Sequence, residues 1–233
     1  MSTELPGPRP WFPLNLRVIK RAIGHNRFVI EQIRSRLAEY DARPIETAGH
    51  PTAAVLCALY VSGDEVYVVL TKRTDKVEKH KGEIAFPGGG CELDDADCIA
   101  TALREAEEEI GLAPSDVRVI GRLDDIITIT NYHVTVYVGL IEADLPYEWR
   151  LQAREVAEVI EVPLSHLLEP GTLIEFEVQR NGETLRREGY RFGEHVIWGA
   201  TGRMLCNFLE AAVLEPETAG AADGAPFRNL TVG

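Results

Sequence analysis

The chain has 233 residues, of which 45% are hydrophobic and 26% are charged, a composition typical of one globular core with appendages. Its 37 acidic and 24 basic residues give a formal net charge of −13, which disfavours binding to nucleic acid or to an anionic membrane. No apolar run approaches the roughly 20 residues that span a bilayer, and the first residues lack signal-peptide features, so we expect a soluble, cytoplasmic protein.

Apolar residues recur at helical spacing near the start of the chain, between Leu16 and Tyr40, with Gly24 as a candidate break between two helices. We therefore expect residues 1–50 to form an N-terminal helical extension. This extension would either cover the core or build the interface of a homodimer. The main domain is expected to span residues 51–214. Residues 215–233, rich in Ala, Gly, Pro and Glu, are expected to form a flexible tail.

Strands outnumber helices in the rest of the chain. Apolar and β-branched runs separated by turn residues predict strands at residues 52–61, 65–70, 84–90, 117–123, 126–130, 133–141, 158–162, 173–179 and 184–191. Helical periodicity predicts helices at residues 98–110, 164–168 and 201–214, and Asp97 is the expected N-cap of the first of them. This order predicts an α+β fold in which a β-sheet is sandwiched between helices.

The cysteines give no sign of a disulfide scaffold. There are four, Cys57, Cys91, Cys98 and Cys206, and none of them forms a CxxC pair. We expect reduced thiols, mostly buried, rather than disulfides or zinc ligands.

The predicted helix at residues 98–110 separates apolar from acidic residues. Its apolar positions form one stripe that can bury against a sheet: Ile99, Ala102, Leu103, Ala106 and Ile110. Glu105, Glu108 and Glu109 follow the spacing i, i+3 and i+4 and therefore lie together on another face. Three carboxylates are thus expected to converge near the end of the helix.

Like charges at this spacing repel, and the C-terminal end of a helix also disfavours anions, so a compensating cation is expected. Mg²⁺ and Mn²⁺ fit, because they prefer oxygen ligands and are commonly bound by carboxylates together with substrate phosphates. Arg104 could also hold one carboxylate through a charge-assisted pair. The alternative is a solvated acidic helix face. The glycines of FPGGG, residues 86–90, favour a site, because a tight turn leaves backbone groups accessible to a diphosphate.

FPGG followed by REAEEEIGL resembles the Nudix box, G-x5-E-x7-R-E-U-x-E-E-x-G-U, in which U is aliphatic. The second half matches at Arg104, Glu105, Ala106, Glu108, Glu109, Gly111 and Leu112. In the first half, counting from Gly89 puts Asp95 in place of the first Glu with one extra residue before Arg104, whereas counting from Gly90 keeps the spacing but puts Ala96 there. The resemblance implies a Nudix-type mixed sheet and metal-dependent cleavage of a nucleoside diphosphate linked to another group.

The preceding segment, LTKRTDKVEKHKGEIAFPGG, resembles the extended motif of the coenzyme A pyrophosphatase branch of this family. The matches are Leu70, Thr71, Arg73, His80, Gly82 and residues 86–89, while Val77 and Glu78 replace a Leu-Arg pair. The basic residues of this segment are Lys72, Arg73, Lys76, Lys79 and Lys81. Such a patch suits coenzyme A, which carries a 3′-phosphate besides its diphosphate. An ordinary solvated basic loop is the alternative.

The branch resemblance implies hydrolysis of coenzyme A or its derivatives to 3′,5′-ADP and 4′-phosphopantetheine or its acyl form. Mg²⁺ or Mn²⁺ would be held by Glu105, Glu108, Glu109 and the Gly88 carbonyl. The expected catalytic residues are Arg104, Glu105 and Glu155, with Glu105 or Glu155 as the proton acceptor. The expected substrate-binding residues are Lys72, Arg73, His80, Gly88 and Gly89, with Arg73 or its lysine neighbours reading the 3′-phosphate. The alternatives are a Nudix pyrophosphatase for NADH or ADP-ribose and a catalytically silent Nudix-fold binding module.

Overall fold

The computed structural model describes residues 26–46, 49–75, 82–180 and 182–214. The expected helix before Gly24, residue His80 and the expected tail lie outside these ranges. The helices are α1 (Asn26–Glu39), α2 (Cys98–Ile110), α3 (Leu164–Leu167) and α4 (Gly199–Phe208), with a 3-10 turn at Pro114–Asp116 and a π-helical turn at Leu209–Val213. The first seven strands are β1 (Thr52–Ser62), β2 (Glu65–Arg73), β3 (Ile84–Ala85), β4 (Gly88–Gly90), β5 (Val117–Arg122), β6 (Ile126–Ile127) and β7 (His133–Ile141). They are followed by β8 (Val156–Pro163), β9 (Leu173–Arg180), β10 (Glu183–Phe192) and β11 (His195–Trp198).

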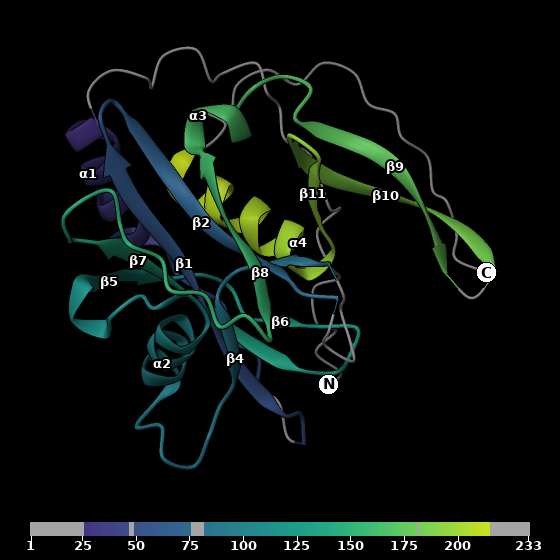
Figure 1. Cartoon of the computed structure of the whole chain (residues 1–233), viewed down its shortest axis with the longest axis horizontal. Coiled ribbons are helices and arrows are strands. Elements are labelled where there is room, and N and C mark those ends of the chain that lie inside the picture. The colour runs from purple at the N-terminus through teal and green to yellow at the C-terminus, as the bar shows by residue number, and fades with distance from the viewer. Residues whose placement is uncertain (1–25, 47–48, 76–81, 181, 215–233) are drawn as a thin grey trace, which may run out of the picture.

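A mixed sheet forms the centre of the molecule (Figure 1). Its main path runs β3-β2-β1-β7-β5, while β4 pairs with β1, β6 with β7 and β8 with β2. The pairing of β1 with β7 is parallel and its other pairings are antiparallel. Strands β9, β10 and β11 form a second, antiparallel sheet whose hairpin extends away from the main sheet in Figure 1. The α+β class and the mixed sheet are therefore confirmed.

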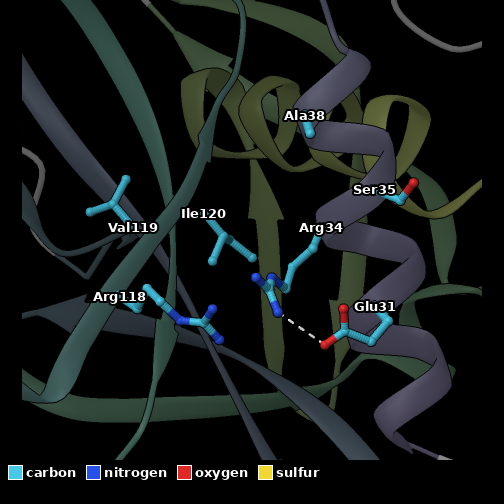
Figure 2. A pocket seen from close by; sticks show the side chains of 7 residues that line it. All are labelled: Glu31, Arg34, Ser35, Ala38, Arg118, Val119 and Ile120. Atoms are coloured by element: carbon cyan, nitrogen blue, oxygen red, sulfur yellow. Dashed lines mark hydrogen bonds and ion pairs between the residues drawn. The ribbon is translucent and has the colours of Figure 1, made fainter.

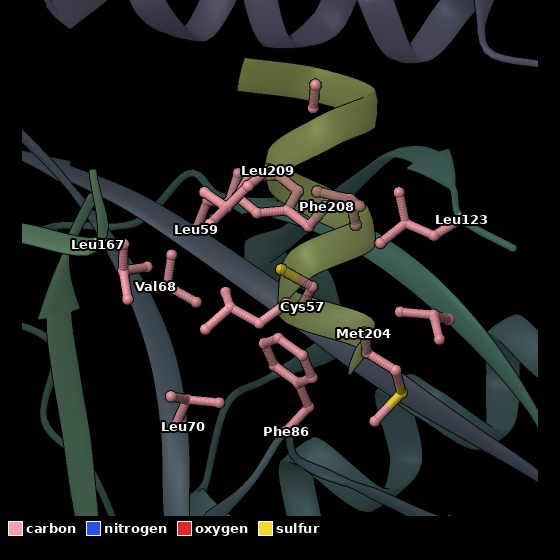
Figure 3. Close-up of a cluster of buried hydrophobic side chains, with 14 of the residues drawn as sticks. Cys57, Leu59, Val68, Leu70, Phe86, Leu123, Leu167, Met204, Phe208 and Leu209 are labelled. Atoms are coloured by element: carbon pink, nitrogen blue, oxygen red, sulfur yellow. The ribbon is translucent and has the colours of Figure 1, made fainter. Parts of the chain in front are cut away.

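Helices cover both faces of the central sheet, as the sequence predicts. On β1, Cys57 and Leu59 point into a cluster shared with α1 and α4, whereas Leu56 and Ala58 point into a second cluster shared with α2. This alternation follows from the two-residue period of a strand. Figure 3 shows the first cluster, in which Phe208 and other residues of the α4 region pack over β1 and β2. None of the described helices is long and apolar enough to cross a membrane.

The structure differs from the predicted elements at several places. The expected strand at 84–90 is two short strands, because the chain leaves β2 after Ala85 and pairs with β1 from Gly88 onward. The strand expected at 126–130 ends at Ile127 and the strand expected from Glu158 begins at Val156. The last helix starts two residues early, at Gly199, and β11 was not predicted.

Helix α1 covers the core, which is one of the two roles expected for the N-terminal extension. Ile30, Ile33 and Leu37 are all buried in the first cluster. The turn after α1 is also anchored, because the Tyr40 hydroxyl donates to Asp124 at 2.8 Å and accepts from Asn207 at 2.9 Å. The described half of the extension is therefore part of the folded core.

Ile33→Ala is expected to lower the free energy of unfolding by about 2–5 kcal/mol, because Ile33 is 1% exposed and its truncation leaves a cavity. Phe28→Ala on the same helix is the control, since Phe28 is 57% exposed and should cost less than about 0.5 kcal/mol. Urea denaturation measures both. Equal losses for the two variants would contradict the packing of α1 against the sheet.

Candidate active site

Helix α2 forms as predicted because both of its ends are capped. The Asp97 side chain accepts a hydrogen bond from the Ala100 N–H at 2.8 Å, and Gly111 ends the helix with a left-handed φ of 72°. Ala102, Ala106 and Ile110 are buried against the sheet. This packing fixes the rotation of the helix and therefore the direction of its carboxylates.

The three carboxylates of α2 differ in burial. The side chain of Glu109 is 6% exposed, that of Glu105 is 17% exposed and that of Glu108 is 52% exposed. Burial, the largest cause, raises the pKa of Glu109 to about 7, and the charges of Glu105 and Glu155 act in the same direction. Burial also raises the pKa of Glu105, to which the charges of Glu108 and Glu155 contribute. One mutually repelling group is therefore formed by the three α2 carboxylates and Glu155.

Arg104 links this group to the loop before α2. Its Nε donates to Oδ1 of Asp95 at 2.9 Å and its Nη2 donates to Oδ2 at 3.1 Å, while its Nη1 donates to Glu105 at 3.0 Å. This contact with Arg104 holds the pKa of Asp95 well below its ordinary value. Asp95 therefore orients Arg104, and Arg104 orients Glu105. The sequence pattern puts Asp95 at an acidic position of the motif, but its pairing with Arg104 was not predicted.

The glycine strand β4 lies directly against the carboxylates. The Gly88 N–H donates to Oε2 of Glu109 at 3.3 Å, and the Gly90 carbonyl accepts from Arg104 at 3.1 Å. Gly88 has a φ of +154°, and a Cβ there would stand 2.4 Å from the Ala54 carbonyl oxygen. A Cβ on Gly89 would stand 2.5–2.7 Å from the carboxylate atoms of Glu105. Only glycine lets the strand approach this closely.

Gly89→Ala is expected to lower kcat/KM about 10-fold or more, because the added methyl group displaces the Glu105 carboxylate. Gly90→Ala is a matched control, since a Cβ on Gly90 meets nothing within 4 Å. Steady-state hydrolysis by both variants, with circular dichroism to check the fold, tests the expectation. A Gly89→Ala enzyme as active as Gly90→Ala would show that the position of Glu105 does not matter.

Arg73 lies at the same group of carboxylates rather than in a separate basic loop. Its Nη1 is 3.8 Å from Oε1 of Glu109 and its Nη2 is 3.8 Å from Oε2 of Glu155. Its Nε is buried and has no hydrogen-bond acceptor among the described residues. The structure thus brings together Arg73 at the end of β2, Glu155 just before β8, and the carboxylates of α2.

Lys72 contacts a different carboxylate, that of Glu158. Its Nζ is 4.0 Å from Oε2 of Glu158, and Nε2 of His195 is 3.5 Å from Oε1 of the same carboxylate. His195 comes from β11, which was not predicted, and nothing in the local sequence indicates its approach to this site. His80 and the lysines at 76, 79 and 81 lie outside the described residues.

The donor set fits a hard divalent cation. Several carboxylates, one of them buried, repel one another at one place, and carboxylate oxygens are the ligands that Mg²⁺ and Mn²⁺ prefer. In the described part of the chain no three His, Cys, Asp or Glu side chains are preassembled as a metal cage. Arg104 and Arg73 contact the carboxylate oxygens instead.

A groove of about 450 Å³ lies elsewhere on the molecule, between α1 and β5 (Figure 2). Arg34 extends into it from α1 and Arg118 from β5, and Arg34 is paired with Glu31 at 3.0 Å. The groove shares no residue with the carboxylates of α2. We therefore place the candidate site at α2 and β4, where the acidic and basic groups converge.

Comparisons with known proteins identify the family of the chain. A family model described as NUDIX domain matches residues 50–186. An uncharacterized Nudix hydrolase, NudL, from Escherichia coli strain K12 is 40% identical over 160 residues, which cover 69% of this chain and 82% of that protein. A MutT/nudix family protein from Enterococcus faecalis superposes with a TM-score of 0.50 at 13% identity, covering 78% of this chain and 68% of that one. With a matched domain that contains β1 to β9 and the carboxylate helix, the chain belongs to the Nudix family.

Proposed function

We propose that the chain hydrolyses the diphosphate of coenzyme A or its derivatives to 3′,5′-ADP and 4′-phosphopantetheine or its acyl form. The observation that carries the hydrolase reaction is the group formed by Glu105, Glu108 and Glu109 against the glycine strand β4. Membership of the Nudix family supports a nucleoside diphosphate derivative as the substrate class. The motif between Leu70 and Gly89 supports coenzyme A within that class.

Glu105, Glu108 and Glu109, with the Gly88 carbonyl, are the proposed ligands of Mg²⁺ or Mn²⁺. When bound, such an ion neutralises charge that develops on the phosphates and lowers the pKa of an attacking water. Its positive charge would also favour the ionised form of Glu109, whose pKa is raised mainly by burial and also by the charges of Glu105 and Glu155.

The side chains of the protein supply orientation and proton transfer. Arg104, held by Asp95, keeps the Glu105 carboxylate directed at the glycine strand. Glu105 or Glu155 accepts the proton of the attacking water; the Glu155 side chain is 45% exposed and therefore accessible to water. Arg73 binds oxygens of the diphosphate, which fixes the diphosphate beside the carboxylates, and Lys72 is a candidate to bind the 3′-phosphate.

The test is a substrate panel of coenzyme A, dephospho-coenzyme A, NADH and ADP-ribose, assayed with Mg²⁺, with Mn²⁺ and with a chelator. We expect coenzyme A to have the highest kcat/KM and the chelator to remove the activity. Higher kcat/KM for NADH or ADP-ribose would favour another Nudix pyrophosphatase. Binding without turnover of any of the four would favour a silent binding module.

A further inference from the structure

Two cysteines face each other at the edge of the candidate site. Cys91 Sγ is 3.9 Å from Cys98 Sγ, and both side chains are partly exposed. Cys91 directly follows β4, and Cys98 is the first residue of α2. The loop between them carries Asp95, which orients Arg104. The pair therefore joins the two elements that build the carboxylate site.

The other two cysteines are in a different environment. Cys57 and Cys206 are buried, so the expectation of mostly buried thiols holds for two of the four. Burial raises the pKa of Cys57 far above its ordinary value and that of Cys206 to about 12. Because the thiolate is the reactive form, both are protected from oxidants at neutral pH. Cys91 and Cys98 are the pair that an oxidant can reach.

Closing a bond between Cys91 and Cys98 must bring the two sulfurs closer together. A disulfide has a sulfur–sulfur distance of about 2.05 Å, so the two sulfurs must approach by almost 2 Å. Cys91 is held by its N–H, which donates to the Thr52 carbonyl at 3.0 Å, and the adjacent Gly90 carbonyl accepts from Arg104 at 3.1 Å. Any movement of the Cys91 backbone is therefore passed to β4 and to Arg104.

We propose that Cys91 and Cys98 are a hydroperoxide-sensitive pair whose reversible disulfide displaces β4 and Arg104 and so lowers the activity of the carboxylate site. The effect on catalysis rests on the proposed function. Formation of the disulfide does not, because it depends only on the geometry of the two thiols. The two parts are therefore tested by separate measurements.

The oxidation proceeds in two balanced steps. The Cys91 thiolate attacks one oxygen of hydrogen peroxide, the O–O bond breaks, and a sulfenic acid and hydroxide form. Cys98 then attacks the sulfenic sulfur, the S–O bond breaks, and water leaves. In total, two thiols lose two electrons and two protons, and one peroxide becomes two waters. Burial, the largest cause, and the neighbouring Cys91 raise the pKa of Cys98.

The experiment treats the reduced full-length protein with hydrogen peroxide and measures intact mass, titratable thiols and hydrolysis. We expect a mass loss of two hydrogen atoms, the loss of two thiols and a peptide map that joins residues 91 and 98. Activity should fall about 10-fold or more, because displacement of β4 and Arg104 misplaces the catalytic groups. Dithiothreitol should restore mass, thiol count and activity together.

Two single variants serve as controls. Cys91→Ser and Cys98→Ser should each keep their activity through peroxide treatment, whereas Cys206→Ala should respond like the wild-type protein. If peroxide adds oxygen atoms without joining the two cysteines, the pair is refuted. If the disulfide forms and hydrolysis is unchanged, the regulatory role is refuted.

A protein that hydrolyses no substrate would refute the proposed function, and the pair would then be judged separately. The shift in melting temperature on addition of Mg²⁺ reports on the same carboxylates without turnover. The oxidised wild-type protein should show a smaller shift than the reduced protein, and the Cys91→Ser protein should show no such difference. Equal shifts before and after disulfide formation would refute the coupling.

Discussion

Glu109→Gln is expected to lower hydrolytic activity on the order of 10²-fold or more, because a neutral amide is a poor ligand for a hard cation. Glu109 is the most buried carboxylate of α2, and it accepts a hydrogen bond from Gly88 in the glycine strand. Glu107→Gln is a matched control, since Glu107 is exposed on the same helix. Steady-state assays of both variants with Mg²⁺ measure the difference. Wild-type turnover by Glu109→Gln would exclude the carboxylate site.

The same variant is expected to stabilise the metal-free protein. Burial raises the pKa of Glu109 from an ordinary 4.5 to about 7, so the folded state binds this proton more tightly than the unfolded state does. The unfolding free energy then falls as the pH rises through this interval, by roughly 3 kcal/mol when Glu109 is fully ionised. Glutamine carries no charge, so Glu109→Gln removes this loss of unfolding free energy. Metal-free Glu109→Gln should therefore melt above the wild-type protein at about pH 8 and close to it at about pH 4.

Mg²⁺ should reverse this order at the higher pH. The ion stabilises the wild-type protein by binding its folded state, and it should have a much smaller effect on Glu109→Gln. This crossing separates a lost metal ligand from simple misfolding, which would lower the melting temperature under every condition. A Mg²⁺-induced shift equal to that of the wild-type protein would place the metal on other residues.

Local signals explain why some elements could be predicted closely. Helix α2 was predicted at both ends because Asp97 and Gly111 cap it and its apolar residues keep one period. The hairpin of β9 and β10 was located by its Asn181-Gly182 turn, where Gly182 has a φ of +83°. In both cases, neighbouring residues determine the structure.

Other elements depend on pairing between distant residues. Strand β11 has only four residues and exists by pairing with β10, in a register that sets Trp198 opposite Gly189. The break between β3 and β4 arises because β3 pairs with β2 and β4 with β1. No local pattern encodes such a change of partner.

In the candidate site, too, some positions follow from local sequence and others depend on contacts between distant residues. Helical spacing predicts Glu105, Glu108 and Glu109 on one face of α2, and Arg104 contacts two of them, Glu105 and Glu108. The position of Arg73 could not be predicted, because it depends on β2 ending beside the C-terminal half of α2. The sequence pattern assigns Arg73 to a basic loop that reads the 3′-phosphate. The structure places its guanidinium 3.8 Å from Glu109 and Glu155.

This position leads to an expected result for Arg73→Ala. A guanidinium beside the carboxylates is within reach of the diphosphate, which coenzyme A and dephospho-coenzyme A share. Its loss should therefore lower kcat/KM for both substrates by the same factor, corresponding to roughly 1–3 kcal/mol for a charged contact that is partly desolvated. Arg73→Lys should recover part of the loss, because it keeps the charge but not the planar fork.

The ratio of the two kcat/KM values decides between the two roles of Arg73. If Arg73 bound the 3′-phosphate, its replacement would lower kcat/KM for coenzyme A but not for dephospho-coenzyme A, because the latter lacks that group. Lys72→Ala makes the comparison sharper, since Lys72 contacts Glu158 instead of the α2 carboxylates and remains a candidate for the 3′-phosphate. We expect Lys72→Ala to change the ratio and Arg73→Ala to leave it unchanged. If Arg73→Ala lowered kcat/KM for coenzyme A alone, this would contradict the contact with the diphosphate and support the role predicted from the sequence.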